Sequence, residues 1–154
     1  MKTLMTLLLL AAAAETSVEY DPQSDFSRYH TWSWHAGVTP AANPANDKRI
    51  RETIENGLAG RGLSRVDKDA ALLVVYHASK TTQIDLTPVK NTPPTNTGIR
   101  YAEKGSLVVD MLDAASGNVV WRGHASAVLN YGQNEIAAQI KTAVDKLLER
   151  FPPR

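Results

Sequence analysis

Residues 105–129 constrain the fold most, because they contain two segments of alternating apolar and polar side chains on either side of one short turn. Alternation at period two is typical of strands that bury one face. The turn, Ala115 to Gly117, suits a three-residue hairpin loop in which the glycine adopts the left-handed backbone conformation. The segment therefore predicts a β-hairpin with a bulged turn.

The side chains of this hairpin also predict its register. Pairing Ala114 with Asn118 gives one apolar face, with Met111 opposite Trp121, Val109 opposite Gly123 and Leu107 opposite Ala125. On the other face the same register sets Asp110 opposite Arg122 and Val108 opposite His124. A shift by one residue would turn every side chain to the other face and set Asp110 against Trp121. The apolar face and the cross-strand ion pair thus predict the same register.

Three further segments have the pattern of strands. Residues 17–20 form a short first strand that ends at Asp21 and Pro22, because proline cannot continue a ladder. Residues 31–35 alternate large apolar and small polar side chains. Residues 70–86 begin as an apolar run and then become polar, which predicts a middle strand whose second half extends toward solvent.

Two segments have the four-residue spacing of amphipathic helices. Asn46 and Asp47 form a cap signal for the first helix, whose apolar side carries Ile50, Ile54 and Leu58. Gly57 inside this helix is expected to mark a close approach to the sheet. Asn134 caps the final helix, whose apolar stripe comprises Ile136, Ile140, Val144, Leu147, Leu148 and Phe151.

These elements predict a fold of the α+β class. The expected architecture is a two-layer α/β sandwich of about five mostly antiparallel strands, with both helices packed on one face. The other face would be exposed, or covered by a long proline-containing loop at residues 87–104 or by a partner.

Residues 28–37, RYHTWSWHAG, bring together two tryptophans, a tyrosine and two histidines. They could form an aromatic platform for a sugar or another flat ligand, or one strand of the core. Period two puts Trp32 and Trp34 on one face, and Met111 and Trp121 offer apolar partners. We therefore assign these four residues to the structural core.

Composition and motifs argue against several classes of function. The formal net charge is +1, from 17 basic and 16 acidic residues without a basic run, so we expect no nucleic-acid partner. The chain has no cysteine, and its four histidines lack the spacing of metal ligands. No nucleophile elbow or phosphate-binding glycine loop is present. We expect no enzyme, with no catalytic residue, metal or cofactor.

The N-terminal segment predicts export. Lys2 is followed by an apolar stretch and by Ala12, Ala13 and Ala14, the order found in a signal peptide with its cleavage site. We expect residues 1–14 to be a signal peptide and residues 15–154 to form a single domain. The alternative is a helix that packs on the domain or anchors it, but the stretch is shorter than the roughly 20 residues needed to cross a bilayer.

Two stretches resemble a known family. They are YDPQSDFSRYHTWSW (residues 20–34) and VDMLDAASGNVVWRG (residues 109–123), and the terminal FPP agrees with them. The chain is similar, over residues 18–153, to the bacterial envelope family catalogued as domain of unknown function 4136. The resemblance implies an α/β fold and a lipoprotein-like protein of the periplasm or cell envelope, possibly associated with the outer membrane, and supplies no catalytic residue.

The sequence departs from a lipoprotein at one point. A lipoprotein signal ends in a cysteine that receives the lipid, and residues 11–17 contain none. We therefore do not expect lipid anchoring by that route, and membrane association and oligomeric state stay open.

The first functional hypothesis is a non-enzymatic envelope domain that binds another envelope protein. The contact would involve Ile99, Arg100 and Tyr101 in the long loop, with whichever sheet surface the helices leave open.

Two alternatives come from other classes. One is a small-ligand or lipid-binding protein, whose sign would be a deep apolar cavity between the helices and the sheet. The other is a hydrolase that uses His77 or His124 with an aspartate such as Asp110, which needs a histidine within hydrogen-bond reach of a carboxylate.

Overall fold

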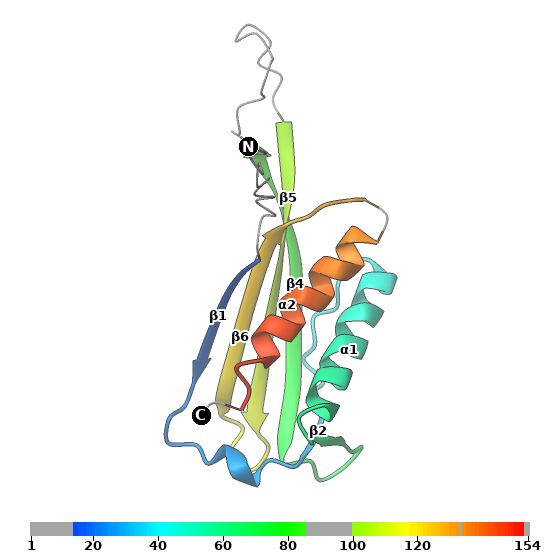
Figure 1. Cartoon of the computed structure of the whole chain (residues 1–154). Helices are drawn as coiled ribbons and strands as arrows, with labels where there is room; N and C mark the ends of the chain where they lie inside the picture. Colours follow the sequence, from blue (N-terminus) through cyan, green and yellow to red (C-terminus); the bar gives the residue numbers. More distant parts are fainter. Residues whose placement is uncertain (1–13, 86–99, 133, 153–154) are drawn as a thin grey trace, which may run out of the picture.

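A six-stranded sheet with two helices on one face makes up the fold (Figure 1). The computed structural model describes residues 14–85, 100–132 and 134–152. In chain order the elements are β1 (Glu15–Tyr20), the 3-10 helix η1 (Phe26–Arg28), β2 (Thr31–Trp34), α1 (Pro44–Ala59), β3 (Ser64–Arg65), β4 (Leu72–Asp85), β5 (Arg100–Asp113), β6 (Val119–Val128) and α2 (Glu135–Leu148). The predicted α+β class and helix-on-sheet layering are confirmed.

The sheet is mixed, and its strand order is β1-β6-β5-β4-β2-β3. The first four strands in this order are antiparallel, whereas β2 is parallel to both β4 and β3. The prediction of about five mostly antiparallel strands is therefore wrong in number and in the pairing at this edge. The parallel pairs arise because α1 leads the chain from β2 back across the sheet, so that the next strand starts at the same end.

The β5–β6 hairpin has the predicted register over most of its length, with Met111 opposite Trp121 and Asp110 opposite Arg122. Near the turn the prediction is wrong, because the Asp113 N–H donates to the Asn118 carbonyl at 2.9 Å. The extra residue forms a bulge next to Met111, closer to the strand centre than expected.

The side chain of Asp113 explains the earlier turn. Its Oδ1 accepts hydrogen bonds from the backbone N–H groups of Ala115 and Ser116, at 3.0 and 2.8 Å. Such an Asx turn closes the loop one residue before the predicted position. Gly117 has the expected left-handed conformation, with φ of +74°.

Helix α1 begins earlier than predicted. Asn43 is its cap, and the Asn43 Oδ1 accepts from the N–H groups of Ala45 and Asn46 at 2.9 and 3.2 Å. Pro44 then occupies the first helical position, where its missing N–H costs no hydrogen bond. The predicted cap at Asn46 and Asp47 is wrong because the stronger signal, asparagine followed by proline, lies three residues upstream.

Helix α2 begins after Asn134, as predicted, but Asn134 has a φ of +64° and its side chain caps nothing. Both helices run in the same direction along the sheet (Figure 1). A Cβ placed on Gly57 would overlap Cδ1 of Leu148. The close approach marked by Gly57 is thus between the two helices, not between helix and sheet.

The core lies between the sheet and the C-terminal halves of the helices. Trp32, Trp121 and Met111 are fully buried there. Trp34 is half-buried and packs against the cluster, with its ring edge-to-face on Trp32 at 5.0 Å between centroids. Its indole N–H donates to Glu55 Oε1 at 3.0 Å. Trp34 thus links β2 to α1.

Strand β5 is longer than the sequence predicted, whereas β4 lies within the predicted residues 70–86. Residues 100–104, expected in a loop, belong to β5, and Arg100 pairs with Asp85. Residues 86–99 lie outside the described residues. Neither described helix combines the length and hydrophobicity that a membrane-spanning helix requires.

Candidate functional site

Beyond the N-terminal ends of both helices, β4 and β5 continue as a two-stranded extension (Figure 1). We call this extension, residues 82–85 and 100–103, the ribbon. Ile84 lies directly opposite Tyr101, and their exposed fractions are 59% and 67%. Arg100 contacts Asp85 at 3.4 Å between Nη2 and Oδ2. Of the three residues predicted to bind a partner, Arg100 and Tyr101 therefore lie on the ribbon, and Ile99 lies outside the described residues.

Three side chains fasten the base of the ribbon to the segment that follows β6. Lys80 Nζ lies 2.7 Å from Glu103 Oε1, and the Tyr131 hydroxyl donates to Glu103. The Lys80 ammonium also lies 6.0 Å from the centroid of the Tyr131 ring. We call Lys80, Glu103 and Tyr131 the rim cluster, because Lys80 and Tyr131 also line the cavity described next.

A cavity of about 510 Å³ lies between the sheet and the N-terminal halves of the two helices. We call it the inner cavity. Four of the sheet residues that face it are small, namely Ala78 on β4, Gly105 on β5, and Ala125 and Ala127 on β6. Further down the same strands, the positions that face the helices carry large residues such as Trp121 and Met111. The cavity exists because the side chains at this end are too short to reach the helices.

The helix side of the inner cavity is aliphatic. Ile50 of α1 and Ile136, Ile140 and Ala143 of α2 line it, with Leu107 from the sheet side. Amide side chains lie at its edge, and the one on Gln139 donates to the Val128 carbonyl at 2.7 Å and accepts from the Asn130 N–H at 3.1 Å. The walls are thus apolar and the polar groups at the edge already have partners.

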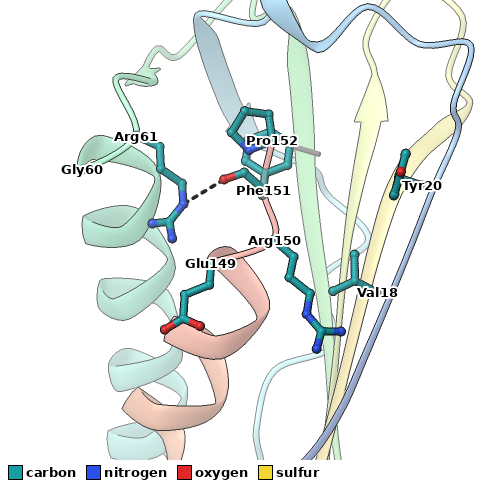
Figure 2. A pocket seen from close by; sticks show the side chains of 8 residues that line it. All are labelled: Val18, Tyr20, Gly60, Arg61, Glu149, Arg150, Phe151 and Pro152. Atoms are coloured by element: carbon teal, nitrogen blue, oxygen red, sulfur yellow. Dashed lines mark hydrogen bonds between the residues drawn. The ribbon is translucent and has the colours of Figure 1, made fainter. Parts of the chain in front are cut away.

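Figure 2 shows a second hollow at the opposite end of the molecule, where both helices end. Its volume is about 830 Å³, and β1 contributes Val18 and Tyr20. Arg61 donates from Nε to the Phe151 carbonyl and from Nη1 to the Gly57 carbonyl, both at 2.9 Å. Cations near helix C-termini commonly satisfy such carbonyls. We therefore interpret Arg61 here as a structural side chain that joins the two helix ends.

The arrangement required for the hydrolase hypothesis is not assembled by the residues involved. His124 Nε2 lies 2.8 Å from Ser106 Oγ, and His77 Nδ1 lies 2.8 Å from Thr39 Oγ1. Both carboxylate oxygens of Asp110 accept from Arg122, at 2.6 and 2.7 Å. Within the described ranges, no group of three or more histidine, aspartate and glutamate side chains could hold a metal ion.

Sequence reasoning considered a cavity between the helices and the sheet as one alternative, but it did not identify the residues that form the inner cavity. The alternating pattern records only whether a strand position is apolar, and a small residue fits it as well as valine does. The small residues at these positions are Ala78, Gly105, Ala125 and Ala127. The overlooked signal was side-chain volume: residues 123–127 read Gly-His-Ala-Ser-Ala, with every inward position small. A run of small inward residues on neighbouring strands indicates a gap in the core unless a helix moves closer.

The fold is shared with solved structures. A DUF4136 family protein from Bacteroides thetaiotaomicron VPI-5482 is 14% identical, with a TM-score of 0.61 over 90% of this chain and 96% of that chain. PelC from Paraburkholderia phytofirmans, solved as a dodecamer, is 12% identical, with a TM-score of 0.59 over 92% of this chain and 99% of that chain. No curated protein matches the chain. The family model described as domain of unknown function (DUF4136) matches residues 16–153, and the chain therefore belongs to this family.

Proposed function

We propose that the protein is a non-enzymatic domain of the bacterial cell envelope that binds a protein partner through the ribbon. The observation that carries the proposal is the exposed cross-strand pair of Ile84 and Tyr101, on the part of the sheet that extends past both helices. Tyrosine and large aliphatic side chains supply much of the binding energy where they become buried between proteins.

The geometry of the ribbon favours strand pairing with a partner. β6 pairs with β5 only as far as Lys104, so the outer part of β5 extends beyond the strand beside it. An extended strand edge accepts another strand through main-chain hydrogen bonds, with alternate side chains giving specificity. The rim cluster holds the base of the ribbon against the domain, which lowers the entropic cost of ordering it on binding.

The proposed location and lack of catalysis rest on the sequence. The charged start, apolar centre and alanine-rich end of residues 1–14 support export. The lack of nucleophile and phosphate-binding motifs, together with the ion pair that occupies Asp110, supports a binding role.

A second candidate is assembly with further copies of this chain. PelC, which is similar in fold, was solved as a dodecamer. The same ribbon would serve such an assembly, since a strand edge can pair with an identical strand.

The test is photo-crosslinking in the producing cells, with the crosslinking residue placed at Tyr101. The matched control is Tyr20, which is 48% exposed and pairs with Trp121 near the hairpin turn, at the end of the sheet away from the ribbon. We expect adducts from position 101 that are absent from position 20 and are lost with Ile84→Ser. Adducts at multiples of the chain mass would identify self-assembly, and a single other protein would identify the partner. Equal labelling from both positions, or none from 101, would refute the proposal.

A further inference from the structure

We propose that the inner cavity binds a single aliphatic chain, the acyl tail of a fatty acid or of a phospholipid. This inference goes beyond the proposed function, because it uses the face of the sheet under the helices and not the ribbon. It rests on three properties of the cavity: it is held open, its walls are aliphatic, and its entrance is polar.

On the α1 side, one aspartate holds the cavity open. Asp47 Oδ1 accepts from the Tyr76 hydroxyl at 2.5 Å and from the Ala41 N–H at 3.0 Å. Tyr76 is fully buried, so its ring stands as a spacer between β4 and the first turn of α1. The helix cannot approach Ala78 without breaking these hydrogen bonds, and breaking them would leave a buried hydroxyl without a hydrogen-bond partner.

On the α2 side, Gln139 also holds the cavity open. Its amide bonds both the Val128 carbonyl and the Asn130 N–H, which fixes α2 to the end of β6. At the other end of the helices the contact between Gly57 and Leu148 brings α1 and α2 together. The helix layer is therefore anchored at both ends, and the space above the small residues is preformed, as in most small-molecule sites.

The walls favour an aliphatic ligand over other classes. Isoleucine side chains of the two helices line one side, and small residues together with Leu107 line the sheet side. Among the described residues of the lining, the only cationic side chain is Lys80, which pairs with Glu103, and the only aromatic one is Tyr131, both in the rim cluster. A nucleotide would require free cations, and a sugar would require aromatic stacking and convergent hydrogen-bonding groups. A methylene chain gains binding free energy from apolar burial alone.

The size and entrance of the cavity agree with a tail-first ligand. About 510 Å³ lies within the range of sites that enclose a small molecule, roughly 300–1,000 Å³. The edge carries the side chains of Asn43 and Asn46 and, from the rim cluster, those of Lys80 and Tyr131. A polar head would remain there in contact with water and with hydrogen-bonding groups, while the tail displaces poorly held water from the apolar walls.

The test uses the purified protein and cis-parinaric acid, a fluorescent linear fatty acid, as the probe. Two substitutions on α2 form a matched pair: Ala143→Phe places a ring in the cavity, and Ala138→Phe places the same ring on the exposed side of the helix. We expect saturable binding of one probe per chain, weakened about tenfold or more by Ala143→Phe and unchanged by Ala138→Phe.

Competition distinguishes the ligand class and its source. Palmitate should displace the probe, and pyrene, a flat aromatic of similar hydrophobicity, should not. Displacement by lysophosphatidylcholine as well would show that a phospholipid tail is accepted, and failure to displace would restrict the site to free fatty acids. Because Ala143→Phe could fail to fold, Ile140→Ala provides a second readout: by lengthening the cavity it should shift the preference toward longer fatty acids.

The inference is overturned if the native protein binds no probe saturably, if pyrene competes as well as palmitate, or if the folded Ala143→Phe and Ala138→Phe proteins bind alike. None of these results bears on crosslinking at Tyr101, so the two proposals can fail separately.

Discussion

The Tyr29 hydroxyl donates a hydrogen bond to Asp113 Oδ2 at 2.8 Å, although 84 positions separate the two residues in the chain. Arg28 Nη2 contacts the same oxygen at 2.5 Å. The contact ties the segment after η1 to the turn of the β5–β6 hairpin. A carboxylate with this many donors is stabilised in its charged form.

This relationship predicts an acid-sensitive contribution to stability. The Ser116 backbone N–H and the Tyr29 hydroxyl lower the pKa of Asp113 from 3.8 to about 2. Because the pKa is lower in the folded state, the stabilisation is complete above the unfolded pKa and is lost as the pH falls from about 4 to about 2. Denaturant unfolding measured across this range should show the free energy of unfolding decreasing, and NMR titration of Asp113 should give the low pKa directly.

Tyr29→Phe should remove part of this effect. The variant loses a hydrogen bond to a buried charge, so we expect it to unfold more easily at pH 7 by about 1–2 kcal/mol. The pKa of Asp113 should rise, and the dependence of stability on pH between 4 and 2 should become shallower. A variant with native stability at pH 7 and an unchanged Asp113 titration would contradict this account.

Gly123→Ala should destabilise the protein. A Cβ at this position would lie 2.6 Å from the outer ring carbon Cη2 of Trp121, which is fully buried and has no room to move. We expect a loss of about 1–3 kcal/mol from overpacking, measured by thermal unfolding. Gly60→Ala is the control, since the nearest atom to its Cβ would be the Asn56 carbonyl oxygen at 3.4 Å, and its melting temperature should stay near that of the native protein.

Arg122→Gln alone should lower the free energy of unfolding by more than a double variant in which both charges of the ion pair are removed. Asp110 is 5% exposed, so its carboxylate would be left buried without the two hydrogen bonds from Arg122. We expect a loss of about 2 kcal/mol for the single variant and a smaller loss for Asp110→Asn combined with Arg122→Gln. If the single and the double variant lost the same stability, the ion pair would contribute as little as an exposed ion pair does.

Ile84→Ser should leave stability unchanged, within about 0.5 kcal/mol, because the side chain is 59% exposed. Circular dichroism melts of this variant and of the native protein should therefore coincide. Coincident melts would allow any lost crosslinking to be attributed to binding. A large drop in melting temperature would instead give Ile84 a structural role.

Local patterns in the sequence predicted the helices and strands in which apolar side chains recur at a regular spacing. The hairpin register followed from Asp110, Arg122 and their apolar neighbours, because a slip of one residue reverses every face of a strand. Helix α2 followed from its apolar stripe in the same way. The two-residue strand β3 has no repeat to read, so neither it nor the parallel edge that it shares with β2 could be predicted.

The sequence by itself determined the α+β class, the two helices and the hairpin register as far as Met111 and Trp121, because these follow from the regular spacing of side chains along one helix or two neighbouring strands. Only the tertiary structure decided which residues meet from distant segments. Tyr29 reaches Asp113, and Tyr76 holds Asp47 away from Ala78, through contacts that no local spacing encodes. The inner cavity is of the same kind, since an unfilled volume depends on how far the helices stand from three neighbouring strands.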